Sequence, residues 1–263
     1  MSDDDLRDWF GQGGPASGSD PMASARRGAK PALPKRFYKA AGWAEGEGGY
    51  VLTLDGRPAR TPARSPLALP TRPLAEAVAA EWEAQAETID PSAMPLTRLA
   101  NSAIDGVAPR REAVLDDLAA YAGTDLVVYR AASPESLVAA QAAAWDPVLD
   151  WAREELGARF ILGEGVMHVA QDEDSVEAVR AALRATEGAF HLAALHAMTT
   201  LAGSVLIALA TARGRLAPDE GWLAANVDED FQARVWGYDA EAAARRAARE
   251  AEFLAAGRMH ALA

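Results

Sequence analysis

The chain of 263 residues contains no cysteine. Disulfide bonds, thiolate nucleophiles and thiolate metal sites are therefore excluded. Lysine is almost as scarce, because the chain has only Lys30, Lys35 and Lys39. A P-loop needs a lysine that reaches the nucleotide phosphates, and Schiff-base chemistry needs a lysine amine. Residues 40–263 can build neither.

Positive charge is also in short supply. The 38 acidic residues outnumber the 26 basic ones, which gives a formal net charge of −12. An acidic surface repels phosphate backbones, so nucleic acid is not expected as a partner. Half of the residues are hydrophobic, a composition typical of a globular protein.

Two segments are candidates for membrane targeting, and neither indicates it. Residues 1–33 begin with an acidic run and continue with Gly, Ser, Pro and Ala, so we expect a disordered tail and no signal peptide. The stretch from Ala189 to Ala212 has no charged residue and is long enough to span a bilayer. It contains two histidines and several hydroxyl side chains and lacks terminal Trp or Tyr. We therefore expect a buried central helix and no stable membrane insertion.

Short apolar runs separated by glycine and proline predict a small antiparallel β unit over residues 34–70. Within it, Asp55-Gly56 is a typical hairpin turn. Thr71 is the expected N-cap of a helix, and further helices are predicted at about 97–105 and 110–121. Residues 125–130 are predicted to be a strand that closes the β unit.

From residue 134 onward the pattern is mostly helical. Helices are predicted at 135–156 with an interruption at Pro147, and at 173–186, 188–213, 218–235 and 239–256. Apolar runs beside Gly163 and Gly165 predict a hairpin or two short strands. The sequence therefore predicts an α+β fold, with a tail at 1–33, a small β-rich N-terminal domain at 34–132 and a C-terminal α-helical bundle domain at 133–263.

The sequence contains no recognisable catalytic or metal-binding motif. His191 and His196 are five residues apart, which places them about 140° apart around a helix, so neither a metal nor a cofactor is expected. Ser204 lacks the second glycine of a nucleophile elbow, and we interpret Gly203-Ser204 as a point of close helix approach. The alternative function is an enzyme whose carboxylates and histidines assemble only in the fold.

One acidic cluster differs from the others, because Asp228-Glu229-Asp230 lies within a predicted helix and is followed by Gln232 and Trp236. Spacings of three and four residues place Glu229, Gln232 and Trp236 on one helix face. A carboxylate, an amide and an indole together could form a recognition surface. The alternative is that Trp236 packs into the bundle and the acidic side chains are only solvated.

Short strings that run in order along residues 35–260 carry a family resemblance. They are Lys35-Arg-Phe-Tyr-Lys39, Leu54-Asp-Gly-Arg-Pro58, Glu81-Trp82, Met94-Pro-Leu-Thr97, Asn101-Ser-Ala-Ile-Asp105, Thr124-Asp125-Leu126, Trp145-Asp-Pro147, Asp228-Glu229 and Trp236-Gly237. Together they resemble the F1-ATP synthase assembly chaperone family that acts on the alpha subunit. The family commonly has Asn-Thr-Ala-Ile-Asp where this chain has serine, which keeps the hydroxyl group.

The resemblance implies a two-domain protein, β-rich and then helical, that binds the unassembled alpha subunit and prevents its aggregation until it pairs with beta. No cofactor and no small-molecule substrate are implied. The acidic N-terminus favours a bacterial cytoplasm over a mitochondrial matrix. A subunit that stays in the finished complex is a further alternative.

The resemblance also implies roles for particular residues. An acidic residue of the helical domain is important in the family, and Glu229 is the best match, with Glu241 second. The other expected partner-binding residues are Asp228, Gln232, Trp236 and Asp239. Trp82 is expected to serve folding or binding, and the remaining family-motif residues are Asp55, Gly56, Arg57, Asn101, Asp105 and Asp125.

Overall fold

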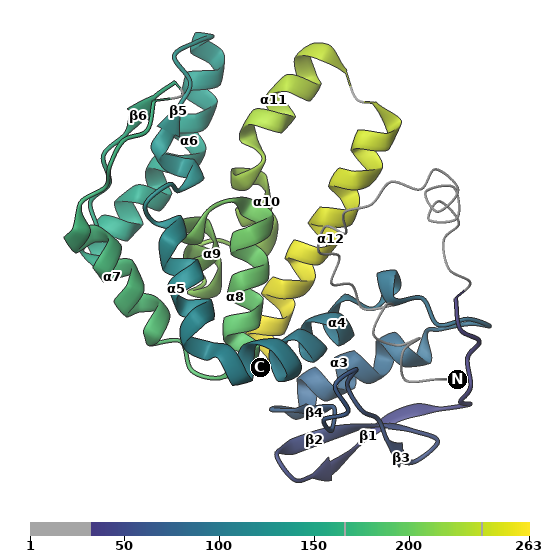
Figure 1. The fold of residues 1–263 in the computed structure, drawn as a ribbon. Helices are drawn as coiled ribbons and strands as arrows, with labels where there is room; N and C mark the ends of the chain where they lie inside the picture. The colour runs from purple at the N-terminus through teal and green to yellow at the C-terminus, as the bar shows by residue number, and fades with distance from the viewer. Residues whose placement is uncertain (1–32, 166, 238) are drawn as a thin grey trace, which may run out of the picture. The chain divides into compact units, whose positions relative to one another are not determined.

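The structure, a computed structural model, describes residues 33–165, 167–237 and 239–263 (Figure 1). The expected tail at 1–33 lies outside this range except for its last residue. The chain divides into two units, one ending at Asn101 and the other beginning at Ser102. The boundary expected from sequence, 132/133, lies further along the chain, because the helix over 111–121 packs against helices of the second unit. The α+β class is confirmed, with a small sheet first and helices after it.

Four short strands form an antiparallel sheet in the first unit. They are β1 (Ala41–Gly46), β2 (Gly49–Leu54), β3 (Arg57–Pro58) and β4 (Ala68–Leu69), and the other three all pair with β2. The predicted hairpin turn is confirmed, since Leu54 pairs with Arg57 across Asp55-Gly56. Both turn residues have positive φ, at 49° and 76°, which the Asp-Gly pair tolerates well.

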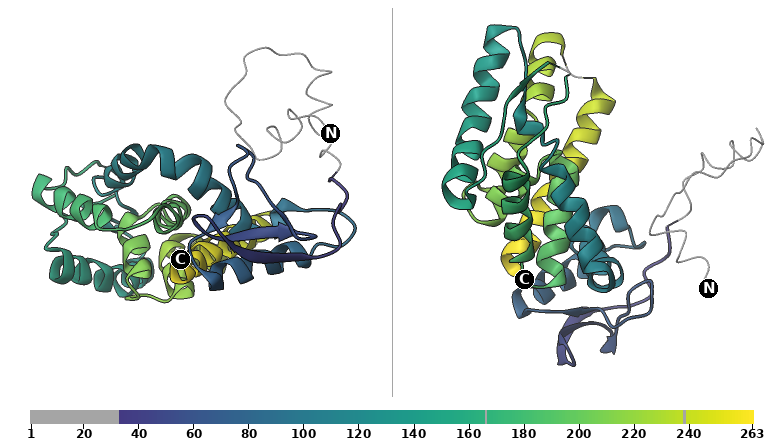
Figure 2. Two further views of the ribbon diagram at one scale, coloured as in Figure 1. Left: turned by 90° about the horizontal axis from the view of Figure 1, so that it is seen from below. Right: turned by 60° about the vertical axis from the view of Figure 1, so that its left-hand side comes forward.

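Helix α3 (Arg72–Glu83) lies along one face of this sheet, and α4 (Pro95–Asn101) packs against α3 (Figures 1 and 2). The N-cap prediction is confirmed, because the Thr71 hydroxyl accepts a hydrogen bond from the N–H of Leu74 at 3.3 Å. The core of the unit consists of fully buried aliphatic side chains from the sheet and α3, among them Leu52, Leu69, Leu74 and Val78.

The second unit is a bundle of helices. After a π-helical turn, Ser102–Val107, come α5 (Arg111–Tyr121), α6 (Glu135–Trp151), α7 (Glu173–Arg184), α8 (Ala189–Ala202), α9 (Val205–Ala212), α10 (Pro218–Ala225), α11 (Val227–Trp236) and α12 (Ala240–Leu262). A second π-helical turn, Ala152–Leu156, extends α6. Pro147 lies inside α6 and does not interrupt it, so the predicted break there is wrong.

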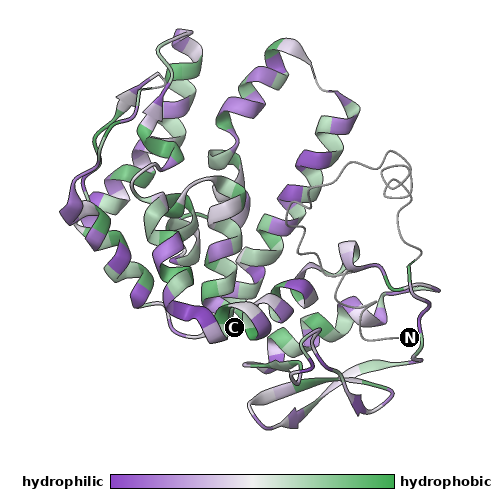
Figure 3. Ribbon diagram, in the orientation of Figure 1, coloured by the Kyte–Doolittle hydropathy of each residue, from purple (hydrophilic) through white to green (hydrophobic). Residues whose placement is uncertain are grey.

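The charge-free stretch forms two buried helices instead of one. Helix α8 ends at Gly203, whose φ of 68° suits a C-terminal glycine, and Ser204 caps α9 by accepting from the N–H of Ile207 at 3.0 Å. A Cβ at Gly203 would meet no atom within 4 Å, so the interpretation as a close helix approach is wrong. Every residue from Val205 to Thr211 is buried, and Figure 3 shows this region as mostly hydrophobic. Among the described residues, no helix is both long and apolar enough to cross a membrane.

The strand predicted at 125–130 is mostly wrong. The Asp125 carboxylate accepts a hydrogen bond from the N–H of Val127, which starts a 3₁₀ turn over Leu126–Val128. Only β5 (Tyr129–Arg130) is extended, and it pairs in parallel with β6 (Gly163–Glu164) inside the second unit. It does not close the N-terminal sheet. The hairpin or strand pair expected beside Gly163 and Gly165 is reduced to β6, and residue 166 lies outside the described range.

Candidate functional site

The acidic cluster of α11 holds this helix in place on two sides. Asp228 accepts a hydrogen bond of 2.7 Å from the Gln141 side-chain amide on α6. The oxygen of the same amide accepts from the N–H of Ala131 at 2.8 Å. On the other side, Asp230 pairs with Arg246 of α12 at 2.7 Å. The acidic side chains are therefore not merely solvated, and α11 is fixed between α6 and α12.

Two arginines of α12 cover the indole of Trp222 in α10. The guanidinium carbons of Arg246 and Arg249 lie 5.7 and 5.8 Å from the ring centroid, within the range of cation–π attraction. Arg249 also donates to the carbonyl oxygen of Leu201 at 2.8 Å and lies 3.6 Å from the Glu229 carboxylate. These contacts tie α12 to α8, α10 and α11.

Helix α11 and residues 240–252 of α12, here called the distal hairpin, contain no buried residue. In Figure 1 both segments extend away from the C-terminus of α12, and residue 238 between them lies outside the described ranges. The buried residues of α12 all lie beyond it, between Phe253 and Met259. The face of the distal hairpin that points away from these contacts is therefore left exposed by the rest of its own unit.

The stripe predicted on α11 lies on this surface. Glu229, Gln232 and Trp236 are all exposed, and Trp236 is 85% exposed. The alternative in which Trp236 packs into the bundle is wrong. The adjacent Val235 is also exposed, and so is Leu223 of α10. Aromatic side chains are enriched in protein interfaces relative to the rest of the surface.

The two acidic residues at the start of α12 differ in their roles. Asp239 is the N-cap, and its carboxylate accepts from the N–H groups of Glu241 and Ala242 at 3.4 and 3.3 Å. Glu241 is exposed and pairs with Arg245, one turn along the same helix. Asp239 therefore shapes the hairpin, whereas Glu241 is available at its surface.

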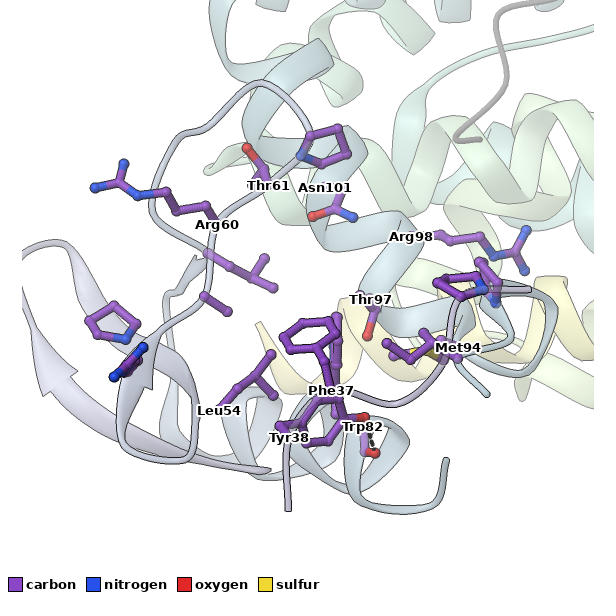
Figure 4. Close-up of a pocket in the computed structure, with 18 of the residues that line it drawn as sticks. Phe37, Tyr38, Leu54, Arg60, Thr61, Trp82, Met94, Thr97, Arg98 and Asn101 are labelled. Atoms are coloured by element: carbon purple, nitrogen blue, oxygen red, sulfur yellow. Dashed lines mark hydrogen bonds between the residues drawn. The ribbon is translucent and has the colours of Figure 1, made fainter. Parts of the chain in front are cut away.

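The family-motif residues of the first unit gather around a groove of about 700 Å³ (Figure 4). Asp55, Arg57, Trp82 and Asn101 are four of the residues that line it. Sequence reasoning did not find this groove. The lining residues include the Phe37-Tyr38 pair and the prolines at 34, 58, 62 and 91. They are visible in the sequence, but they are too far apart along it for their spacing to show that they meet.

Two of these motif residues stabilise the local fold. The Asp55 carboxylate accepts from the N–H groups of Lys39 and Ala40 at 3.0 and 2.9 Å, and these hydrogen bonds lower the pKa of Asp55. The carbonyl oxygen of Trp82 accepts from the Tyr38 hydroxyl at 2.7 Å, and the two rings lie 5.6 Å apart. The Trp82 ring therefore contributes both to the groove wall and to the packing beneath it.

The two motif aspartates of the second unit lie in different surroundings. Asp105 is half-buried in the π-helical turn after α4. Asp125 is fully buried at the N-terminus of α9, where it accepts from the N–H of Leu206 at 3.1 Å. Burial raises the pKa of Asp125 to about 6, although hydrogen bonds from Ser204 and the backbone oppose the shift. The position of Asp125 is explained by capping inside the core.

The histidines contact other side chains of the second unit. No group of three metal-ligating side chains converges anywhere in the described ranges. His196 pairs with Asp117 at 3.0 Å, while His191 and His260 pack edge to face at 4.8 Å beside a smaller cavity. That cavity is lined by one carboxylate, Glu187, and the groove by one, Asp55. Neither supplies the paired acids that the enzymatic alternative requires.

Comparison with known proteins places the chain in a family. The model of the ATP12 chaperone protein family matches residues 35–153. The crystal structure of Atp12 from Paracoccus denitrificans has 47% sequence identity to this chain and a TM-score of 0.81. The match spans 87% of this chain and 98% of the Paracoccus chain. An aspartate-to-lysine variant of the Paracoccus protein gives the same TM-score at 46% identity, and this match spans 87% of this chain and 97% of the variant. The crystal structure of the Atu1473 protein of Agrobacterium tumefaciens has 47% identity and a TM-score of 0.84. This match spans 94% of this chain and 92% of the Agrobacterium chain. The chain belongs to the ATP12 family of F1-ATPase assembly chaperones.

Proposed function

We propose that this chain binds the unassembled alpha subunit of the ATP synthase F1 sector and keeps it soluble until beta replaces the chaperone. The observation that carries the proposal is the distal hairpin, which exposes Trp236 beside Gln232 and Glu229. An isolated subunit exposes apolar surface that assembly later buries, and such surface aggregates. A chaperone that covers this surface lowers the concentration of the aggregating species without any bond-making chemistry.

The contacts of the hairpin suit this role. An exposed indole provides a large contact area at a small entropic cost, and aromatic residues dominate binding hot spots. The salt bridge between Asp230 and Arg246 and the hydrogen bond from Gln141 to Asp228 hold the helix in place before the partner arrives. A preorganised surface loses less entropy on binding. We assign partner binding to Glu229, Gln232, Trp236 and Glu241, with Asp228 and Asp239 shaping the surface.

The charge distribution favours a partner with basic regions. Residues 102–263 contain 25 acidic and 14 basic side chains, whereas residues 33–101 contain eight of each. Nearly all of the net negative charge therefore belongs to the unit that carries the hairpin. Such a field accelerates encounter with a positively charged surface, and the acceleration decreases at high salt.

The proposal is tested by expressing alpha with and without this chain in the bacterial cytoplasm, its proposed compartment. We expect more soluble alpha when the chain is present, a complex that contains alpha but no beta, and release of the chain when beta is added. Equal solubility of alpha in both cultures would end the proposal. Stoichiometric recovery of the chain with mature ATP synthase would instead support a structural subunit.

A further inference from the structure

The groove of the first unit is an unusual combination of apolar walls and a basic rim. Its walls include aromatic and aliphatic side chains from four segments, namely Phe37, Tyr38, Leu54, Trp82, Ile89 and Met94. Figure 4 shows Phe37, Tyr38, Trp82 and Leu54 lying close together at one end. Phe37 is 69% exposed. The exposed ring of Phe37 extends the apolar surface of the groove to the outside, where a ligand could contact it.

The rim of the groove carries three arginines, Arg57, Arg60 and Arg98. The one carboxylate among the lining residues, Asp55, is occupied by the backbone N–H groups of Lys39 and Ala40. Arg57 and Arg60 are exposed. In a chain of net charge −12, this local excess of positive charge favours a ligand that is both apolar and acidic.

The first ten residues of the chain have that chemistry. Asp3, Asp4, Asp5 and Asp8 outnumber Arg7, and they alternate with Leu6, Trp9 and Phe10. The three apolar residues are spaced three and four apart, so a helical turn would place them on one side and most of the acidic residues around them. Two large rings and a leucine side chain are also suited to a groove of about 700 Å³.

We propose that residues 3–10 bind in the groove of their own chain, with Trp9 and Phe10 against the aromatic wall and the aspartates beside the arginines of the rim. This inference goes beyond alpha binding and does not depend on it. It identifies the N-terminal segment as an internal ligand that covers the apolar groove of the first unit.

The length of the connection permits this arrangement. The described chain begins at Leu33, and Pro34 itself lines the groove. Residues 11–32 join the segment to this point. A linker of about 20 residues has an average end-to-end distance of roughly 25 Å and gives a tethered ligand an effective concentration of about 1 mM. Even a weak contact, with a dissociation constant of about 0.1 mM, would then be about 90% occupied.

The absence of cysteine allows a direct test on the full chain. We would introduce Gly11→Cys and Ala63→Cys, attach spin labels to both and measure the distance between them by double electron–electron resonance. Position 11 follows the two rings, and Ala63 is exposed beside Pro62 of the groove lining. We expect one narrow, short distance. It should be lost in Trp9→Ser/Phe10→Ser and kept in the matched linker variant Arg26→Ser/Arg27→Ser.

Charge exchange tests the electrostatic part of the proposal. Arg57→Glu/Arg60→Glu should broaden the distribution of distances between the two spin labels. Asp3→Lys/Asp4→Lys/Asp5→Lys should broaden it as well. The two sets combined should restore the narrow distance, because opposite charges again face each other. A synthetic peptide of residues 2–12 should bind about tenfold more tightly to a chain that lacks these residues than to the full chain, since the tethered copy competes.

Three results would overturn the proposal. The first is a broad distance distribution in the unmodified sequence, with no effect of the ring substitutions. The second is a short distance that appears only when two singly labelled chains are mixed, which would mean that a second copy supplies the segment. The third is a peptide that fails to bind the groove while Phe37→Ala lowers the recovery of alpha, which would assign the groove to the client.

Discussion

The carboxylate of Asp230 and the guanidinium of Arg246 lie 2.7 Å apart, with only 24% and 20% of the two side chains exposed. This pair joins α11 to α12 at a level where neither helix has a buried residue. Because no side chain is fully buried at this level, the ion pair makes a large contribution to the contact between the two helices. Arg246 adds to it by lying over the ring of Trp222.

Replacement of Asp230 by alanine should therefore lower the free energy of unfolding by about 1–2 kcal/mol, because a half-buried arginine loses one of its two carboxylate partners. Arg246→Ala should cost more, since it also removes the contact with Trp222. Urea unfolding followed by circular dichroism measures both changes. The control is Glu241→Ala, which breaks the exposed pair with Arg245 and should change stability by less than about 0.5 kcal/mol. Equal effects of Asp230→Ala and Glu241→Ala would show that the hairpin does not depend on the inner pair.

Trp236 should matter for binding and not for folding. Because its side chain is 85% exposed, Trp236→Ser should leave the unfolding midpoint almost unchanged. If the distal hairpin binds alpha, the same substitution should weaken the complex at least tenfold, as loss of an aromatic hot spot usually does. The matched control is Met167→Ser, which removes an exposed apolar side chain from the segment after β6. Pull-down with immobilised alpha measures how much of each variant is retained. Equal retention of Trp236→Ser and Met167→Ser would contradict the assignment of Trp236.

Glu81, the first residue of the Glu81-Trp82 string, has a structural role in the first unit. Its carboxylate accepts hydrogen bonds from the N–H groups of Leu96 and Thr97, both at 2.8 Å, and from the Thr97 hydroxyl at 2.7 Å. Glu81 thereby caps α4 from α3, although burial raises its pKa. Glu81→Ala leaves these donors without a partner and should cost about 2–3 kcal/mol, while Glu81→Gln should cost about half as much. Glu76→Ala, in an exposed pair with Arg72, is the control for thermal unfolding. A smaller loss for alanine than for glutamine would refute the capping role.

Much of the first unit could be predicted because its signals are local. Asp55-Gly56 specifies a hairpin turn, and Thr71 before apolar residues at helical spacing specifies a helix start, so a few neighbouring residues predict both. The groove could not be predicted in this way. Its walls combine Phe37, Trp82 and Met94, which only the tertiary fold brings together.

The errors in the second unit also have physical causes. The run Asp125–Arg130 has the composition of a strand, yet the Asp125 side chain bonds to nearby backbone and starts a turn instead. Pro147 was expected to interrupt a helix, but tertiary packing keeps α6 continuous around it. The face with Glu229, Gln232 and Trp236 could be predicted from helical spacing. Its exposure could not, because spacing does not show which face of a helix packs.

Asp125 should make the stability of this protein depend on pH in a characteristic way. Its pKa in the folded protein is about 6, compared with 3.8 for an ordinary aspartate, because the carboxyl group is fully buried. A raised pKa means that the folded state holds the proton more tightly than the unfolded state. The contribution of Asp125 is therefore fully present below about pH 4 and is lost as the pH rises to 6 and above, by about 3 kcal/mol in total.

His260 has the opposite effect. Burial, together with the charge of the neighbouring His191, lowers the pKa of His260 to about 4 from an ordinary value of 6.5. Its contribution is present above pH 6.5 and is lost as the pH falls towards 4. The two residues partly cancel in the unmodified protein, so its overall stability profile cannot reveal either of them.

Asp125→Asn separates the two effects because asparagine cannot ionise while His260 is unchanged. We expect the free energy of unfolding of the unmodified protein, minus that of Asp125→Asn, to fall by roughly 2.4 kcal/mol between pH 4 and pH 7. All other titrating groups cancel in this difference. Urea unfolding at half-unit pH steps provides the measurement, and Asp116→Asn, at an exposed carboxylate paired with Arg180, shows what the same exchange does outside the core. If the curves for Asp125→Asn and the unmodified protein were parallel, the carboxyl group of Asp125 would have the same proton affinity in the folded and unfolded chains, and its burial at the start of α9 would carry no electrostatic cost.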